Sequence, residues 1–238
     1  MSAHRYFLWS TGKEGDVSVS DMEAFLHDPR CRSVSSFRRG TVIVPRNRMD
    51  QGADARYVLG RAPCLEDVRE LHTEYRHSKT KIKRFMPAWH PRTMLRLGIF
   101  GGKYLNDCMT EFPREWFQDA LSAGTLLPGP ARRKEGEVAR QVNLCKIHAG
   151  QSLAFWQQQG WMQAPDNRGW FQWFCRYALG RRNKELDERQ MRRWGNFQRF
   201  YSNPKRTAAI SQSLLHWSYP LDYDEAQRAS YQLYRDAQ

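Results

Sequence analysis

The sequence predicts a compact, mainly α-helical fold with a small mixed segment at its N-terminus. Apolar residues recur at three- and four-residue spacing over most of the chain after Pro63, as on the buried face of a helix. Only Thr41–Val44, four residues stopped by Pro45, forms a convincing strand pattern. The chain has 238 residues, enough for one domain or two small ones. We expect a mixed segment over 1–62 and a compact helical domain over 63–238.

Helix boundaries come from the start and stop signals that flank the apolar spacing. The first long helix begins at Pro63 and continues through Leu71 and Tyr75 to about residue 78. Asp187 is the expected N-cap of another helix, whose apolar stripe runs from Met191 to Phe200. The full set comprises a short helix ending near Leu26, helices over 63–78, 113–124, 132–146, 152–160, 169–179 and 187–200, and a final amphipathic helix near the C-terminus.

The charge balance indicates a polyanionic partner. Lys and Arg number 38 against 25 Asp and Glu, which gives a net charge of +13 and an isoelectric point near 9.8. The nine Trp suit base stacking beside arginine, although we expect most of them to pack in the core. A basic protein without such a partner is the alternative. Membrane binding is disfavoured, because no basic helix face lies beside an uninterrupted apolar face.

Cysteine usage and the absence of targeting signals favour a reducing, cytoplasmic compartment, the host cytoplasm if a phage encodes the chain. The five Cys are odd in number and widely spaced, without a CxxC pair or a zinc-type cluster with His. The first ten residues lack the apolar core of a signal peptide, and no run is long enough for a membrane span. We therefore expect no metal, no cofactor and no membrane partner.

The run from Arg76 to Lys103 contains eight Lys and Arg and no Asp or Glu. A surface segment of this length normally carries acids, so their omission favours a segment that faces phosphates. A solvated basic connector is the alternative.

A Gly-Gly-Lys turn closes this run. Backbone N–H groups of Gly101 and Gly102 can approach an anion, and Lys103 adds a positive charge. Asn106 and Asp107 then suit the orientation or deprotonation of a substrate amine, with Glu111 downstream. An ordinary turn is the alternative. The sequence contains no GxxxxGK[ST], GxGxxG, HExxH or zinc-deaminase motif, which disfavours the enzyme classes that depend on them.

A second dense segment follows at 168–182. Trp170, Trp173 and Tyr177 share one face of its helix, while Phe171 and Phe174 share another, so we expect the helix to be largely buried. Arg176 within it is then costly unless it pairs with a phosphate or a carboxylate. We assign phosphate contacts to Arg176, Arg181 and Arg182. The alternative for the last two is an interaction with the negative end of the helix dipole.

Two segments, GIFGGKYLNDCMTEFPREWF and DNRGWFQWFCRYALGRRNKELDERQMRRW, resemble a phage-associated family. This family comprises the alpha-glutamyl/putrescinyl-thymine pyrophosphorylases, viewed as amino acid:DNA transferases. A related helical domain accompanies the 5-hydroxymethyluracil DNA kinases. The resemblance covers roughly residues 92–199 and does not extend to the first ninety.

The resemblance implies a reaction on double-stranded DNA that carries modified thymine. Pyrophosphorylated 5-hydroxymethyluracil would lose pyrophosphate and gain an amine, from an amino acid or a polyamine co-substrate. Cations would stabilise the leaving group, a carboxylate would take the proton of the amine, and a tryptophan, one of Trp170, Trp173 and Trp194, would hold the flipped base. We therefore expect catalytic roles for Lys103, Asp107 and Glu111 and substrate or DNA contacts from Gly101, Gly102, Tyr104, Asn106, Arg168, Trp170, Trp173, Arg176, Tyr177, Arg181, Arg182 and Arg193.

Two other functions fit the same residues. A non-catalytic DNA-binding module would use the basic and aromatic side chains without chemistry. A glycosylase-like enzyme would excise the base with a buried carboxylate or lysine near the sugar, positions that Asp107 and Lys103 suit equally. The helical domain would then have a DNA-glycosylase-like arrangement.

Overall fold

A computed structural model confirms the mainly helical class. It describes residues 26–27, 38–43, 56–59, 67–102, 104–105, 108–126, 142–143, 145–147, 149–151, 153–162, 164–202 and 207–221. The α-helices in these ranges are α2 (Pro91–Arg96), α3 (Arg114–Ser122), α4 (Leu153–Gln158), α5 (Trp170–Ala178), α6 (Lys184–Tyr201) and α7 (Ala208–His216). Short 3₁₀ turns, η3 (Val68–Leu71) and η4 (Met109–Glu111), accompany them.

The helices predicted over 113–124, 152–160 and 169–179 are confirmed as α3, α4 and α5. The helix predicted from Asp187 is also present, but α6 starts earlier. Asn183 is its N-cap, with a side-chain oxygen that accepts from the Leu186 N–H at 3.1 Å. Asp187 lies inside the first turn, where its carboxylate accepts from the backbone N–H of Asn183 at 2.9 Å. Asp187 thus supports the cap without being the cap itself.

The prediction of a helix over 63–78 is wrong for residues 67–78, the part that the structure describes. After η3 the chain forms strand β3 (Thr73–Arg76), which pairs antiparallel with β4 (Ile82–Phe85), Thr73 opposite Phe85 and Arg76 opposite Ile82. The buried positions Tyr75 and Phe85 lie on one face of this hairpin. The four-residue spacing of Leu71 and Tyr75 suits a helix, but it also suits the alternation of buried residues along a strand. Burial of Tyr75 and Phe85 where the hairpin packs against α6 favours the strand.

The strand predicted at the N-terminus is confirmed over two residues. Strand β1 (Val42–Ile43) pairs antiparallel with β2 (Tyr57–Val58). Buried Ile43 and Tyr57 belong to the same apolar core as the helices.

The C-terminal third was predicted less well. Residues 142–143 and 145–147 of the expected helix over 132–146 form turns and bends, and residues 132–141 lie outside the described ranges, as does the expected final helix beyond 221. Helix α7 was not predicted. Its N-cap is Thr207, whose hydroxyl accepts from the backbone N–H of Ile210.

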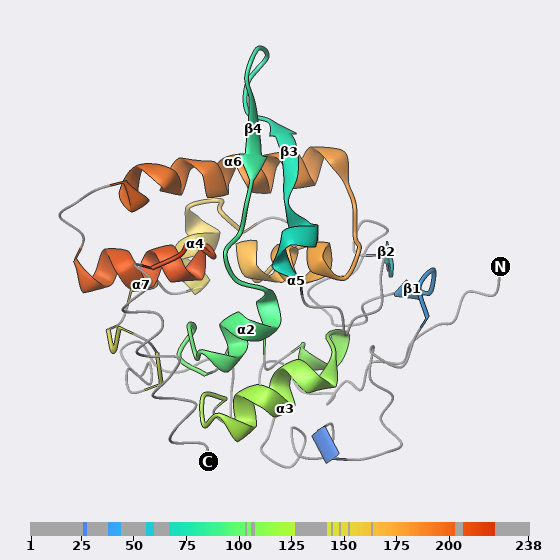
Figure 1. Ribbon diagram of the computed structural model, residues 1–238, viewed down its shortest axis with the longest axis vertical. Coiled ribbons are helices and arrows are strands. Elements are labelled where there is room, and N and C mark those ends of the chain that lie inside the picture. Colours follow the sequence, from blue (N-terminus) through green and yellow to red (C-terminus); the bar gives the residue numbers. More distant parts are fainter. Residues whose placement is uncertain are drawn as a thin grey trace.

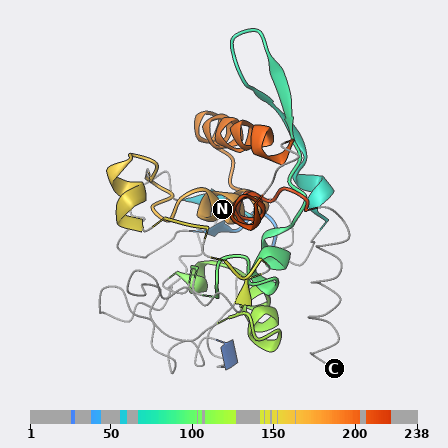
Figure 2. The same cartoon turned by 90° about the vertical axis from the view of Figure 1, so that its left-hand side faces the viewer.

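The elements stack in layers, as Figures 1 and 2 show. Helices α2 and α3 pack together below, α5 lies in the middle, and α6 crosses above it. The β3–β4 hairpin lies against α6 and projects beyond the helical body (Figure 1). Phe85 joins these parts, because its ring contacts Trp173 of α5 at 5.8 Å and Trp194 of α6 at 5.0 Å between centroids.

Hairpin and α6 approach each other closely at Gly195. A Cβ atom at this position would overlap the hydroxyl oxygen of Tyr75. The Tyr75 hydroxyl is buried and has no hydrogen-bond partner among the described residues. Glycine is therefore required here by the approach of the hairpin and not by the helix itself.

We predict that Gly195→Ala lowers the free energy of unfolding by about 1–3 kcal/mol through overpacking, although alanine is the better helix former by about 1 kcal/mol. Tyr75→Phe removes the clashing oxygen together with an unsatisfied buried hydroxyl, so this variant alone should be nearly neutral. In the double variant, Tyr75→Phe should recover most of the loss. Denaturant unfolding of the wild type, the two single variants and the double variant measures these free energies. If Gly195→Ala and the double variant lose the same free energy of unfolding, the Tyr75 hydroxyl does not cause the loss.

Candidate nucleic-acid interface

Helix α5 is buried along its whole length, as its pattern predicted. Trp170 stacks on Phe174 at 4.9 Å, and the Trp173 indole N–H donates to Asp187 at 2.8 Å. Trp194 of α6 is also buried and stacks on Tyr219. All three rings are buried in the core, so the expectation that one of the three tryptophans holds a flipped base is not met in this structure. Tyr177 of the same helix is likewise buried.

The arginines of this segment have carboxylate partners. Arg176 is fully buried and donates from Nε and Nη2 to the two carboxylate oxygens of Glu111 at 2.5 and 2.8 Å. Its Nη1 donates to Asp166 at 3.0 Å. Arg181 donates to both Asp166 oxygens at 2.7 and 2.6 Å. Of the two partners expected for Arg176, the structure therefore contains the carboxylate.

This buried charge cluster (Glu111, Asp166, Arg176 and Arg181) corrects three sequence-based assignments. Arg176 and Arg181 have little or no exposed surface from which to contact a phosphate. Glu111 is fully buried with both oxygens bound by one guanidinium, so it is not positioned to take a proton from an incoming amine. The cluster has two positive and two negative charges, and bidentate pairing of this kind offsets the cost of removing them from water.

Arg182 caps the end of α5. Its guanidinium lies 3.7 Å from the centroid of the Tyr177 ring and donates to the carbonyl oxygens of Tyr177 and Arg181. This is the alternative that the sequence left open, a cation at the negative end of a helix.

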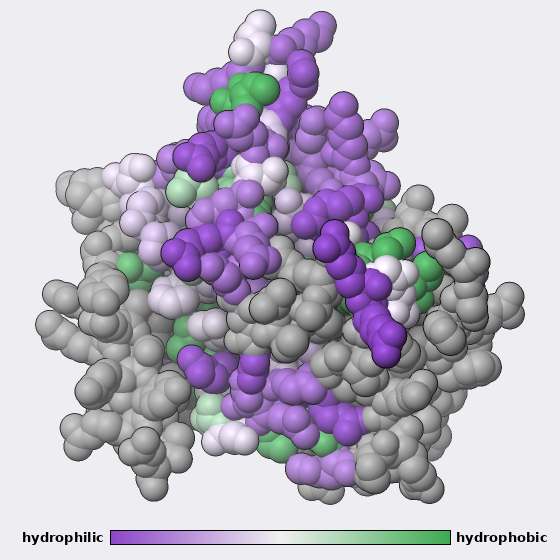
Figure 3. Space-filling model, turned by 45° about the vertical axis from the view of Figure 1, so that its right-hand side comes forward, coloured by the Kyte–Doolittle hydropathy of each residue, from purple (hydrophilic) through white to green (hydrophobic). Residues whose placement is uncertain are grey.

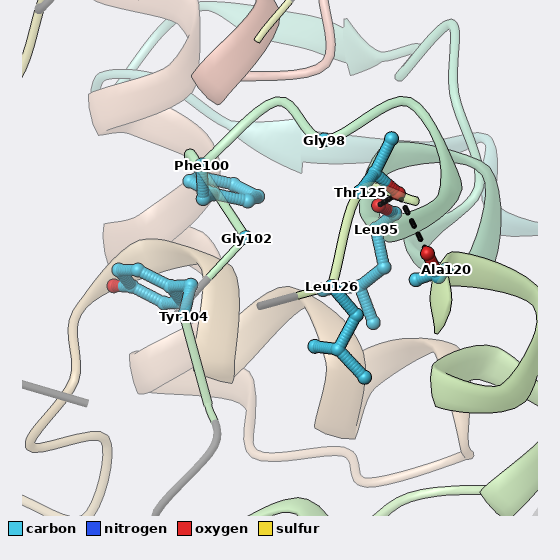
Figure 4. Close-up of a pocket in the computed structure, with 8 residues that line it drawn as sticks. All are labelled: Leu95, Gly98, Phe100, Gly102, Tyr104, Ala120, Thr125 and Leu126. Carbon is cyan, nitrogen blue, oxygen red and sulfur yellow. Dashed lines mark hydrogen bonds between the residues drawn. The ribbon is translucent and has the colours of Figure 1, made fainter. Parts of the chain in front are cut away.

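The Gly-Gly-Lys turn is only partly described, because Lys103, Asn106 and Asp107 lie outside the described residues. Gly101 and Gly102 are buried with φ of 70° and 80°, a conformation that favours glycine. A small pocket beside them is shown in Figure 4. Its lining is mostly apolar or small: Leu95, Gly98, Phe100, Gly102, Tyr104, Ala120, Thr125 and Leu126.

The polar groups of this pocket are engaged within the protein. The Thr125 hydroxyl lies within hydrogen-bond distance of the carbonyl oxygens of Leu95 and Ala120 (Figure 4). The Tyr104 hydroxyl donates to the carbonyl oxygen of Arg168, a buried residue whose backbone N–H donates to Gln172. The described part of the turn therefore contains no side chain that is poised to bind an anion.

The two segments that resemble the thymine-modifying family pack against each other. Phe100 lies 4.2 Å from Phe171 between ring centroids, and Tyr104 bonds to the Arg168 backbone. Farther along, Glu111 pairs with Arg176. The two segments thus form one unit, although the contacting residues Tyr104 and Arg168 are 64 positions apart in sequence.

Basic residues that are exposed or half-buried are concentrated on the hairpin and α6. Residues 73–86 and 184–201 contain ten Lys and Arg against four Asp and Glu. The hairpin is hydrophilic where it projects from the body (Figure 3). We call this the hairpin–α6 surface, and its basic residues are Arg76, Lys79, Lys81, Lys83, Arg84, Lys184, Arg189, Arg192, Arg193 and Arg199.

Only the first half of the acid-free run contributes to this surface. In its second half, Arg92 of α2 forms an ion pair with Asp119 of α3 at 2.5 Å. Arg192 of α6 connects the two parts of the surface, because its Nη1 donates to the carbonyl oxygen of Arg76 at 3.3 Å. Among the site residues expected from the sequence, Arg193 lies on this surface. The other arginines of α6 were not predicted as site residues, although their positions away from the apolar stripe of the helix could have indicated them.

Comparison with protein families, with curated proteins and with solved structures finds no match to this chain. Within the described ranges, no group of three His, Cys, Asp or Glu side chains is arranged to hold a metal ion. None of the described helices is long and apolar enough to cross a membrane.

We predict that Glu111→Gln lowers the free energy of unfolding by about 3–5 kcal/mol, because it leaves a buried positive charge in excess. The double variant Glu111→Leu with Arg176→Met removes one charge of each sign and leaves Asp166 paired with Arg181. Its loss should be at least about 1 kcal/mol smaller than the sum for the two single variants. Additive losses in denaturant unfolding would show that the pair is not coupled.

Proposed function

We propose that this protein binds double-stranded DNA through the hairpin–α6 surface. The observation that carries the proposal is the concentration of ten basic against four acidic residues over 73–86 and 184–201. Arg76, Lys79, Lys81 and Arg84 are all exposed on the projecting hairpin. Such a surface gains affinity for DNA mainly by releasing counterions from the phosphates.

The shape of the hairpin supports duplex DNA as the partner. A two-stranded ribbon fits the major groove of B-form DNA, about 12 Å wide, whereas the major groove of A-form RNA is too deep and narrow for side chains to read. Ile82, opposite Arg76 near the turn, is 60% exposed. An exposed apolar side chain among cations suits contact with the methyl group of thymine.

The double variant Lys79→Gln with Lys81→Gln should bind duplex DNA more weakly and with a shallower salt dependence. Each lost phosphate contact lowers the slope of log K against log salt concentration by about 0.9, so the pair should lower it by about 2. Fluorescence anisotropy with a labelled duplex over a salt series measures the slope.

Lys146→Gln is the matched control, since Lys146 is exposed but lies outside the hairpin and α6. It should leave the slope within error of wild type. If the affinity of the wild-type protein does not change with salt, DNA is not the partner. If Lys146→Gln lowers the salt slope as much as Lys79→Gln with Lys81→Gln does, the phosphate contacts do not lie on the hairpin.

His77, at the start of the hairpin turn, should make DNA binding pH-dependent. Burial lowers its pKa below 6.5, and Lys83, Lys81 and Arg192 lower it further, so the ring is neutral at pH 7 in the free protein. A phosphate bound among these cations favours the protonated ring and raises the pKa. Binding therefore takes up a proton, and affinity should rise as pH falls from 8 to about 6.

The measurement compares dissociation constants of wild type and His77→Asn at constant salt. The variant should lose the rise at low pH. If it keeps the wild-type pH dependence, His77 does not contact the phosphates.

A second candidate function is the amine transfer to pyrophosphorylated 5-hydroxymethyluracil in DNA that the resemblance implies. The packing of the Phe100–Tyr104 region against Phe171 and Arg168 favours it, because both family-like segments then contribute to one part of the molecule. With Glu111 in an ion pair, Asp107 and Lys103 are the remaining predicted catalytic residues. Incubation with the pyrophosphorylated DNA and an amine, followed by nucleoside mass analysis, tests it. An aminated nucleoside supports transfer, a released base indicates excision, and unchanged DNA leaves binding alone.

A further inference from the structure

Arg193 of α6 is half-buried and differs from the buried arginines Arg176 and Arg181 in its partners. Its Nη1 donates to the carbonyl oxygen of Trp161 at 3.2 Å and to Gln190 Oε1 at 3.0 Å, and its guanidinium lies 5.4 Å from the Trp217 ring. Burial lowers its pKa, and the nearby cation Arg189 lowers it further. Among the residues that the structure describes, no carboxylate forms an ion pair with it.

A half-buried guanidinium held between neutral groups and another cation is energetically unfavourable without an anion. Arg176 and Arg181 show how this protein satisfies such a group, with carboxylates at 2.5–3.0 Å. Arg193 instead donates to the carbonyl oxygen of Trp161 and to Gln190, and an anion would supply the charge that these neutral partners lack.

Trp161 provides the second, independent observation. It follows α4, and its side chain is 48% exposed, whereas Trp116, Trp170, Trp173 and Trp194 are almost completely buried. Its ring packs in a T-shaped arrangement with Phe155, 5.8 Å between centroids, and about half of the residue remains exposed. An exposed aromatic side chain whose backbone is bonded to a guanidinium has the two groups that single-stranded nucleic acids use, a ring for stacking and a cation for phosphate.

We infer that Trp161 and Arg193 form a site for an unpaired nucleotide, with its base stacked on the Trp161 indole and its phosphate paired with Arg193. The site adjoins the hairpin–α6 surface, to which Arg193 also belongs, on the flank of α6 that carries its contact with Trp161. Figures 1 and 2 show α6 between the projecting hairpin on one side and α4 on the other. The inference deepens the proposed function and in that sense rests on it. A protein that grips a duplex with the hairpin can hold an extruded nucleotide across α6.

The test measures binding of a labelled short oligothymidylate and, separately, of a labelled duplex. Trp161→Ala should weaken oligothymidylate binding about tenfold, because a stacked base contributes on the order of a tenfold to hundredfold in affinity. Trp161→Phe keeps an aromatic face and should lose much less. Neither substitution removes a charge, so the salt slope should stay at the wild-type value.

Arg193→Gln should weaken the oligothymidylate complex and lower its salt slope by about 0.7, the value for one phosphate contact on a single strand. Arg193→Lys keeps the charge and should retain the slope. Thermal unfolding of each variant separates loss of binding from loss of fold.

The duplex arm distinguishes this inference from the proposed function. Trp161→Ala should leave duplex binding unchanged, and Lys79→Gln with Lys81→Gln should affect the duplex more than the oligothymidylate. If folded Trp161→Ala binds oligothymidylate as tightly as the wild-type protein does, the nucleotide site is wrong. This result would not affect the proposal that duplex binds the hairpin–α6 surface. The proposed function alone would be overturned if the wild-type protein bound oligothymidylate but not duplex, and if Trp161→Ala lost the oligothymidylate binding.

Discussion

Two arginines and two carboxylates meet in the interior where α5 passes into α6, and the position of the basic surface depends on them. Arg176 holds Glu111 and Asp166, and Asp166 in turn holds Arg181. The charges join η4, the loop before α5, α5 itself and the connection to α6. Removing any one of them leaves an unbalanced charge away from water, which proteins tolerate poorly. The cluster therefore fixes how these four parts of the chain pack together at this junction.

The junction sets the direction of α6, and α6 sets the position of the hairpin. Asn183 and Asp187 fix the first turn of α6, while the Trp173 indole ties Asp187 back to α5. At the other end of this chain of contacts, Phe85 packs on Trp194, and Gly195 admits Tyr75. The contrast with Arg193 is informative. Arg176 and Arg181 have buried carboxylate partners and serve the fold, whereas Arg193 has no carboxylate partner among the described residues and is proposed to bind an external anion.

Much of the helical fold could be predicted from the sequence, because α3, α5 and α6 each carry an apolar stripe over two or more turns. The hairpin could not, since each strand has four residues and Tyr75 fits helical and extended spacing equally. The burial of Arg176 was predictable from its helix, but the choice between phosphate and carboxylate depended on Glu111 and Asp166 folding against it. Trp161 gave no signal, because exposure of one tryptophan among nine is a property of the tertiary structure.

Amide hydrogen exchange with and without duplex DNA tests the central claim most directly, because it maps the contact surface on the unmodified protein. The account predicts that duplex slows exchange in peptides from 73–86 and 184–201, while α3 on the opposite side of the body is unchanged (Figure 1). Protection confined to α3 or α2, with none in the hairpin or α6, would contradict it.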